Sequence, residues 1–342
     1  MSFTAMKENV FNEIVEWIES RLTINPSVED IARGVGYSRR SVYNIFHEYA
    51  GLPVGKYIRM RRMTLAAGKL RLTNQPISSI ACSLHFDSHQ TFSREFKKAF
   101  GRCPSQYRHS AYWDMSALYQ KVGPQGDRLP VPWLCFLEEQ TFSGYGFTYT
   151  LSLAEGICAR KNVTRRKIAA EMPGGERDIY ILSEFSPAAN NLYKVTIGSF
   201  IGAPVSSRER PFREIRVAKR GLYLGMEFSG SWEDYVLLSN NVYMKHLPEL
   251  GLYRREGYDI ERFVQPQNVT SGNDRPYYTI QYFCPHLCGL FLWPTSSMSL
   301  PIARRTRPPA AIRNTYYQES CQPTLQLCTN VDSCGLSCQC RV

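Results

Sequence analysis

The sequence predicts an all-α N-terminal domain with two helix-turn-helix motifs joined by a linker helix, followed by an α+β domain with antiparallel strands. Three observations lead to this prediction. The first 110 or so residues contain an internal repeat, and apolar residues within it recur at helical spacing. From about residue 127 onward, short aromatic-rich apolar runs take their place. Hydrophobic residues make up 43% of the 342 residues, which is enough for packed cores.

The internal repeat aligns residues 27–57 with residues 76–107. At an offset of 49 residues, four positions of the first copy match four of the second: Ile31, Ala32, Val35 and Tyr37 against Ile80, Ala81, Leu84 and Phe86. After one extra residue in the second turn the offset becomes 50, and the matches are Val42, Phe46, Gly51 and Tyr57 against Phe92, Phe96, Gly101 and Tyr107. We infer one supersecondary unit built twice.

Local signals in the first copy predict a helix, a tight turn and a second helix. Ser27 is a candidate N-cap, and Asp30 stands three residues later in a capping-box arrangement. Gly36 supplies a residue that can adopt positive φ in the turn. The second helix is expected over Ser38–Tyr49, and Gly51 ends it.

The second copy and its flanks give the remaining helices. We expect a helix over 77–84, a turn at Asp87–Ser88, and a helix over 88–100 that ends at Gly101. An amphipathic helix is expected over 8–22, and a connecting helix over 55–72. Two short helices joined by a short turn form the helix-turn-helix motif, whose second helix enters the major groove of DNA.

The charge is concentrated in the first third of the chain. The net charge is +11, and residues 1–113 carry 16 Lys and Arg against 9 Asp and Glu, or +7. Residues 114–290 contribute +1 and residues 291–342 contribute +3. This asymmetry indicates an acidic partner for the N-terminal region, and double-stranded DNA is the usual one. A merely basic, soluble surface is the alternative.

Residues 8–110 resemble the DNA-binding domain of the AraC/XylS family of transcription regulators. The resemblance is carried by IVEWIESRL (14–22), YIRMRRMTLAAGKLRLT (57–73) and PISSIACSLHFDSHQTFSREFKKAFGRCPSQYR (76–108). It implies that each motif inserts its second helix into one of two neighbouring major grooves, and that a monomer suffices on DNA. It also implies a surface for RNA polymerase on the DNA-binding half.

Side chains that the core does not use on each second helix are candidates for reading DNA. They are Arg39, Arg40, Tyr43 and Asn44 in the first motif and His89, Gln90, Ser93, Arg94 and Lys97 in the second. Arg pairs with guanine, and Asn or Gln pairs with adenine, through two hydrogen bonds each. Lys97 and five further basic residues are candidates for contacting phosphates: Arg59, Arg61, Arg62, Lys98 and Arg102. The alternative for every one of them is a solvated helix face.

The two motifs differ in how closely they follow the family pattern. The second keeps the Gln-Thr-Phe-x-Arg core at 90–94, whereas the first has Arg40, Tyr43 and Asn44 where related regulators carry Trp, Gln and Arg. The resemblance therefore implies that the operator half read by the second motif is retained and the other half is altered.

Residues 111–126 are expected to form a linker to the second domain, at 127–287. Strands are predicted over the apolar runs Thr141–Leu151, Asp178–Glu184, Leu192–Gly202, Gly221–Phe228 and Tyr277–Phe283. A helix is predicted over Ser231–Lys245. The alternation favours an α+β domain with mostly antiparallel strands.

Residues 221–266 resemble the GyrI-like effector-binding domain, which follows an AraC-type domain in some members of the family. The resemblance implies an aromatic-lined cleft for amphipathic or cationic small molecules. An acidic side chain among aromatic rings suits such a ligand through charge pairing and cation–π attraction. The candidates are Glu261, Trp232, Tyr235, Phe147, Tyr149 and Tyr282. The alternative for each aromatic residue is a place in the hydrophobic core, and the alternative for Glu261 is an ion pair with a nearby arginine.

Residues 288–342 form a Cys-rich tail that we expect to be poorly ordered or non-native. Its spacings, Cys328-x5-Cys334-x3-Cys338-x-Cys340, do not fit common zinc patterns, so no metal or other cofactor is expected. Metal or redox binding and a structured addition are the alternatives. No apolar run reaches the length of a membrane span, and no secretory signal opens the chain, so a cytoplasmic location is expected.

The sequence thus predicts a DNA-binding transcription regulator, and the two resemblances imply an activator of stress or multidrug-resistance genes that a small molecule modulates. An enzyme is not expected, because the sequence contains no HExxH, GxSxG, GxxxxGK[ST] or GxGxxG motif and its six histidines are dispersed. The alternatives are an architectural or origin-type DNA-binding protein without regulatory effect, and a GyrI-like hydrolase.

Overall fold

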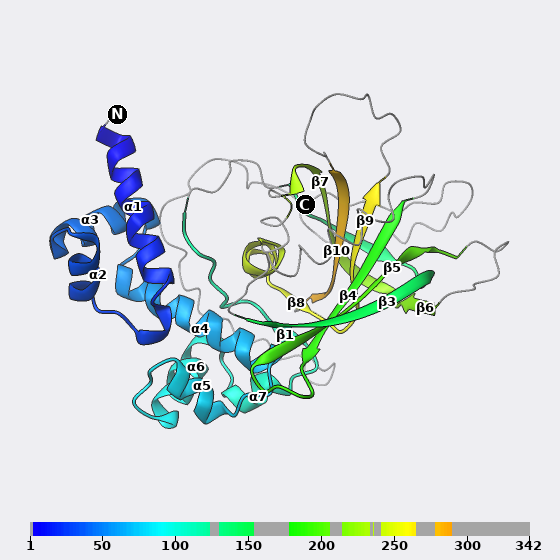
Figure 1. Ribbon diagram of the computed structural model, residues 1–342, viewed down its shortest axis with the longest axis horizontal. Helices are drawn as coiled ribbons and strands as arrows, with labels where there is room; N and C mark the ends of the chain where they lie inside the picture. The colour runs from blue at the N-terminus through cyan, green and yellow to red at the C-terminus, as the bar shows by residue number, and fades with distance from the viewer. Residues whose placement is uncertain are drawn as a thin grey trace, which may run out of the picture.

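The computed structural model describes residues 3–123, 130–153, 178–205, 214–232, 235, 241–264 and 278–288. Helices make up the N-terminal side of the molecule and an antiparallel sheet makes up the C-terminal side (Figure 1). Within these residues, no helix is both long and apolar enough to cross a membrane. The Cys-rich tail, from residue 289 onward, lies outside the described residues.

The first helix pair consists of α2 (Val28–Val35) and α3 (Arg39–Ala50), preceded by α1 (Phe3–Glu19). Ser27 caps α2 as predicted: its hydroxyl accepts from Asp30 N at 3.2 Å, and the Asp30 carboxylate accepts from Ser27 N at 3.1 Å. Gly36 has φ +74° and Gly51 has φ +69°, so both glycines occupy the left-handed region that ends a helix. The predicted start and end signals are confirmed.

The connecting helix α4 (Val54–Leu72) lies between the first pair and the second pair, α5 (Ile77–Ser83) and α6 (His89–Phe100), which α7 (Pro104–Arg108) follows (Figure 1). The predicted helix over 8–22 begins earlier and ends at Glu19, because Leu22–Ile24 forms a 3-10 turn, η1.

The turn of the second pair differs from the prediction. The left-handed residue is His85, with φ +49°, rather than a residue of Asp87–Ser88. His85 occupies the position of Gly36 in the repeat, and in both turns the next residue donates a backbone hydrogen bond of 3.1 Å to an alanine carbonyl, Ala81 or Ala32. A non-glycine residue pays a steric cost there, which the packed turn has to offset.

Within the described residues the sheet has ten strands, all paired antiparallel. Its main path is β1-β8-β10-β9-β4-β5-β3-β6, and β7 pairs with both β10 and β2. The strands are β1 (Trp113–Asp114), β2 (Trp133–Leu137), β3 (Gln140–Ser152), β4 (Ile179–Pro187), β5 (Lys194–Pro204), β6 (Glu214–Ala218), β7 (Gly221–Gly230), β8 (Leu252–Arg254), β9 (Asp259–Val264) and β10 (Tyr278–Cys288).

The five strands predicted from apolar runs correspond to β3, β4, β5, β7 and β10, each within a few residues. The predicted helix over 231–245 falls partly outside the described residues. Trp232 and Tyr235 are helical, and the chain continues as a π-helix, η2 (Val242–His246), and α10 (Leu247–Glu249), so the helical stretch extends past Lys245.

Three hydrophobic cores organise the molecule. One joins α1, the first helix pair and the start of α4 around Phe46 and Tyr57. A second joins the rest of α4 and the second helix pair to one face of the sheet, from Phe96 to Tyr282. A third lies on the opposite face of the sheet around Phe200. The second core therefore crosses from the helical region into the sheet.

Candidate nucleic-acid interface

Helix α3 presents its predicted DNA-reading side chains to solvent. The Ser38 hydroxyl accepts from Ser41 N at 3.1 Å and starts the helix, while Val42 and Phe46 are fully buried on its inner side. Ser41 and Ile45 are half-buried, and the four predicted DNA-reading side chains are exposed: Arg39, Arg40, Tyr43 and Asn44. N-terminal residues of such a helix are the ones that reach base edges in a major groove.

Helix α6 repeats this arrangement. The Ser88 hydroxyl accepts from Thr91 N at 3.1 Å, and Phe92 and Phe96 are fully buried. Of the predicted DNA-reading residues on α6, Ser93 is half-buried and the others are exposed: His89, Gln90, Arg94 and Lys97. The two helices therefore present equivalent rows of polar side chains.

Arg39 differs from its neighbour Arg40 in being tied to the preceding helix. Its guanidinium donates to the Glu29 carboxylate of α2, and this hydrogen bond lowers the pKa of Glu29 below its usual value. Among the described residues Arg40 has no ion pair, so its guanidinium is available for a base or a phosphate.

Three of the predicted phosphate contacts are corrected by the structure. Arg62 is 6% exposed, donates to the Leu84 carbonyl and stacks over the Phe86 ring at 4.5 Å. Arg61 forms an ion pair of 2.8 Å with Glu19, and both side chains are 13% exposed. Arg102 donates to the Tyr112 hydroxyl. These guanidinium groups hold elements of the protein together, whereas Arg59, Lys97 and Lys98 are exposed.

The predicted effector residues lie on one face of the sheet, which we call the effector face. Glu261 of β9 is opposite Tyr282 of β10 and Ile181 of β4, and antiparallel partners share a face. Following the register through β5 places Phe147 and Tyr149 of β3 on the same face. Glu261 and Tyr282 are both fully buried.

The aromatic candidates divide into two groups on this face. The rings of Trp232 and Tyr235 lie 6.4 Å and 6.0 Å from the Phe263 ring, which is two residues along β9 from Glu261. Phe147 and Tyr149 stack on each other at 6.1 Å but lie three strands away from β9. At the usual strand spacing that is ~14 Å, so the sheet brings only the first group close to Glu261.

Sequence reasoning missed a buried polar cluster beside this face. Asp259, fully buried, accepts from the Tyr282 hydroxyl at 2.6 Å and from the Tyr243 hydroxyl, and it pairs with Arg254 at 3.2 Å. Burial, and then the Asp259 charge, raise the pKa of Tyr243 far above its usual value. The one sequence signal for this cluster is Asp259 itself, an acidic residue two positions before Glu261 in a strand that is otherwise largely apolar.

The segment predicted as a linker also contributes packed residues. Trp113 and Asp114 form β1, which pairs with β8, and the Trp113 indole donates to the Tyr107 hydroxyl at 2.9 Å. Farther on, the Tyr119 carbonyl accepts from Arg61 at 2.5 Å, and Val122 packs against the core of the first helix pair. Residues 113–122 therefore join both helix pairs to the sheet.

No cluster of three or more His, Cys, Asp or Glu side chains that could hold a metal ion occurs within the ranges that the structure describes. The exposed side chains at the start of α3 and α6 instead form a surface of hydrogen-bond donors and positive charge.

Comparisons with known proteins identify the helical region. A family model described as a helix-turn-helix domain matches residues 31–110. A solved AraC-type DNA-binding domain protein from Chromobacterium violaceum is similar, with 30% identity and a TM-score of 0.29 over 30% of this chain and 93% of that chain.

Whole-chain relatives extend the similarity into the sheet. The putative HTH-type transcriptional regulator YkgA of Escherichia coli K12 is 34% identical over 64% of this chain and 91% of its own length. The F1 operon positive regulatory protein of Yersinia pestis is 32% identical over 83% and 90%, respectively. The right origin-binding protein of Escherichia coli K12 is 28% identical over 78% and 94%. With these relatives and the helix-turn-helix match, the chain belongs to the AraC/XylS family of DNA-binding transcription regulators.

Proposed function

We propose that this regulator binds DNA as a monomer, with α3 and α6 in two neighbouring major grooves. The observation that carries the proposal is the duplicated helix pair: each copy buries its Phe residues and exposes a row of donors at the start of its second helix. Arg40 and Arg94 are the side chains best suited to guanine, since each is exposed near that start. Lys97, Arg59 and Lys98 supply phosphate contacts.

Selection of bound sequences by the full chain tests this proposal. We expect a site with two halves about one helical turn apart, the half read by α6 resembling that of related regulators and the other half altered. Arg40→Ala should relax the first half, and Arg94→Ala the second, each by about 1–3 kcal/mol of discrimination. Arg33→Ala is the matched control, because Arg33 lies on α2 with a side chain that is 80% exposed. A site with a single half would contradict the proposal.

The sheet is proposed to be a GyrI-like effector-binding domain, spanning about residues 127–287, that takes an amphipathic or cationic small molecule. The buried Glu261 carboxylate and the nearby Trp232, Tyr235 and Tyr282 rings support it, since charge pairing and cation–π attraction strengthen in a desolvated setting. Because these four side chains are almost fully buried, a ligand has to displace part of this packing to reach Glu261.

Titration of the full chain with a quaternary ammonium amphiphile, which is cationic, and with dipyridyl, bile acids and fatty acids, followed by tryptophan fluorescence, tests the effector proposal. Glu261→Gln should abolish the response to a cation. Glu249→Gln, a change at an exposed carboxylate, should not. A flat trace with every compound would count against sensing.

We propose that the DNA-bound protein activates stress or multidrug-resistance genes through contact with RNA polymerase. This takes place in the cytoplasm. One relative is named a positive regulatory protein and another an origin-binding protein, so an architectural role is the second candidate. A reporter gene behind a promoter that the chain binds separates the two. Increased expression supports the activator, and unchanged expression with full occupancy supports the architectural role.

A further inference from the structure

The face of the sheet opposite the effector face contains a hollow formed by the register of three strands. Glu184 of β4, Gly198 of β5 and Thr148 of β3 are direct partners in one row across the sheet. Because successive side chains alternate between faces, and Glu261 pairs with Ile181, the even-numbered residues of β4 lie on the other face. The hollow is therefore separated from Glu261 by the sheet itself.

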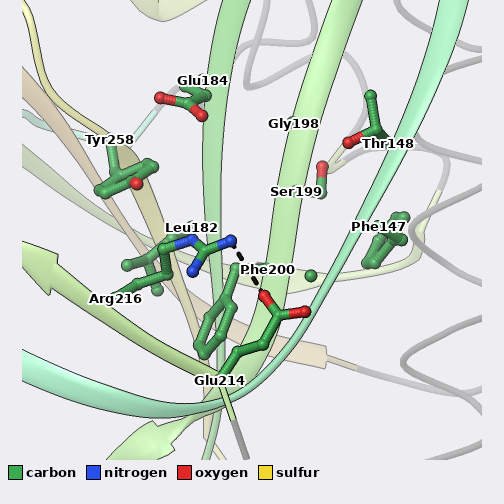
Figure 2. Close-up of a pocket in the computed structure, with 11 residues that line it drawn as sticks. Phe147, Thr148, Leu182, Glu184, Gly198, Ser199, Phe200, Glu214, Arg216 and Tyr258 are labelled. Carbon is green, nitrogen blue, oxygen red and sulfur yellow. Dashed lines mark hydrogen bonds and ion pairs between the residues drawn. The ribbon is translucent and has the colours of Figure 1, made fainter.

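We call this hollow the outer pocket. Its volume is about 260 Å³, and its charged and aromatic walls are Glu184, Glu214, Arg216, Phe200 and Tyr258 (Figure 2). Figure 2 shows Glu184 and Tyr258 at one end and the paired Glu214 and Arg216 at the other. A cavity of roughly 150 Å³ accommodates one benzene molecule, so this pocket has room for a ring with a short side arm.

Two mid-strand glycines keep the pocket open. A methyl group on Gly198 would lie 3.1 Å from Glu184 Oε1, and one on Gly146 would lie 3.0 Å from Glu214 Oε2. Both neighbours are the ends of exposed, flexible side chains. By contrast, methyl groups on Gly144 and Gly202 would lie 2.0 Å and 2.3 Å from backbone oxygens of the facing strand.

The two pairs of glycines therefore have different roles. Gly144 and Gly202 are required for the close approach of β3 and β5. Gly146 and Gly198 have neither a backbone obstacle nor a positive φ, although glycine weakens a strand interior. A glycine within a strand often marks a bulge, a bend or a place where a ligand or another backbone approaches closely. The register runs through Gly146 and Gly198 without a bulge, which favours the approach of a ligand.

The charges of the outer pocket favour a cation. Arg216 pairs with Glu214 at 2.9 Å and lies 5.6 Å from the Phe200 ring. Among the described residues Glu184 has no ion pair, so one negative charge is left over. Burial, followed by the Glu184 charge, raises the pKa of Tyr258, which also lines the pocket.

We propose that the outer pocket is a second small-molecule site, which binds a small protonated amine between the Glu184 carboxylate and the Tyr258 ring. The ammonium group donates to Glu184 and faces the Tyr258 ring, and its organic part lies over the Gly146 and Gly198 backbone. The pocket is smaller than the usual ~300–1,000 Å³ of drug-sized sites, so it excludes bulky amphipathic effectors. This proposal does not depend on the effector proposal.

The test uses three probes of one shape: benzylamine, which is cationic, benzyl alcohol, which is neutral, and benzoate, which is anionic. The full chain is labelled with ¹⁵N-glycine, and its amide signals are followed by NMR. Gly146→Ala and Gly198→Ala assign the two signals of interest by removing them. We expect benzylamine to shift both signals saturably and benzoate to leave both in place. Equal affinity for benzyl alcohol, or no shift with benzylamine, would overturn the proposal.

Variants localise the binding. Gly198→Val places a side chain in the pocket, so this variant should lose benzylamine binding. Its melting temperature should not fall, because strands favour valine. Should this variant not fold, Glu184→Gln gives the same answer, since losing an exposed charge partner weakens binding about three- to fivefold. Glu138→Gln, a change at an exposed carboxylate outside the pocket, should bind benzylamine normally. Normal binding by both Gly198→Val and Glu184→Gln would refute the site.

Discussion

The two helix pairs follow one plan but are held in different ways. The first pair closes its own core with α1 around Phe46, and its link to the rest of the chain runs along α4 and residues 119–122. The second pair shares its core with the sheet, so Phe96 and Tyr282 belong to one continuous cluster. Equivalent DNA-reading helices can thus differ in how strongly they are coupled to a distant ligand site.

A contiguous path of contacts connects α6 to the sheet. Its Phe96 ring contacts Tyr107 at 5.1 Å, and the Tyr107 hydroxyl accepts from Trp113 and donates to the Asp114 carbonyl at 2.5 Å. Trp113 lies 6.5 Å from Tyr243, which donates to the buried Asp259. The corresponding helix of the first pair, α3, packs on α1 instead, through rings such as Phe11 and Phe46 at 5.7 Å.

The largest expected effects come from truncating the two equivalent core rings. Phe46→Ala and Phe96→Ala should each cost about 3–5 kcal/mol of local stability, because each removes a fully buried ring. Hydrogen–deuterium exchange should show the loss confined to α1–α3 and the start of α4 for Phe46→Ala. For Phe96→Ala it should extend into β9 and β10. The same pattern of exchange in both variants would remove the proposed difference between the pairs.

A buried histidine of the sheet should make its stability depend on pH, which separates the sheet from the first helix pair. His286 of β10 is 1% exposed, and burial lowers its pKa to about 4. The unfolded chain takes up a proton near pH 6.5, whereas the native chain does not until about pH 4. Its contribution to stability is therefore fully present above pH 6.5 and is lost as the pH falls through this window, by about 3 kcal/mol in total.

Urea unfolding between pH 7 and pH 4 measures this dependence. His286→Gln should flatten the slope of the unfolding free energy of the sheet against pH. His47→Gln, a change at an exposed histidine of the first pair, should leave it as it was. An unchanged slope in His286→Gln would contradict the prediction.

Two arginines of α4, Arg62 and Arg59, are expected to differ in role: Arg62 stabilises the fold, and Arg59 contacts DNA phosphates. Arg62→Ala should cost about 1–3 kcal/mol, because the Leu84 carbonyl at the end of α5 loses its donor. Arg59→Ala should change stability by less than about 0.5 kcal/mol, since Arg59 is exposed on the same helix. Instead it should reduce the salt dependence of DNA binding by about one unit of slope. Thermal melting and binding at several salt concentrations separate the two, and a swap of these effects would refute the assignment.

The sequence was most informative where local chemistry decides the structure. Ser27, Ser38 and Ser88 start helices and Gly51 and Gly101 end them, because caps depend only on neighbouring residues. The repeat then extended these local signals to a pair of motifs.

Long-range pairing was not readable in the same way. The burial of Arg61 and Arg62 depends on which elements cover α4, and helical spacing alone does not reveal this. The register that places Glu261 beside Tyr282 but far from Phe147 depends on strand order. Short strands such as β1, with two residues, carry too little pattern to be predicted.

The smallest expected effect concerns Glu29, which pairs with a predicted DNA-reading arginine. Glu29 binds Arg39 at the start of α3, and among the described residues nothing equivalent ties His89 at the start of α6. Glu29→Gln should raise DNA affinity about two- to fivefold at low salt, because Arg39 is released and a negative charge near the phosphates is lost. Stability should change little, because an ion pair between two exposed side chains contributes little to the free energy of unfolding. Glu13→Gln on α1 is the matched control, and combining Glu29→Gln with Arg39→Ala should cancel the gain. A gain that persists without Arg39 would assign the effect to general charge, and the two helices would then be equivalent in this respect.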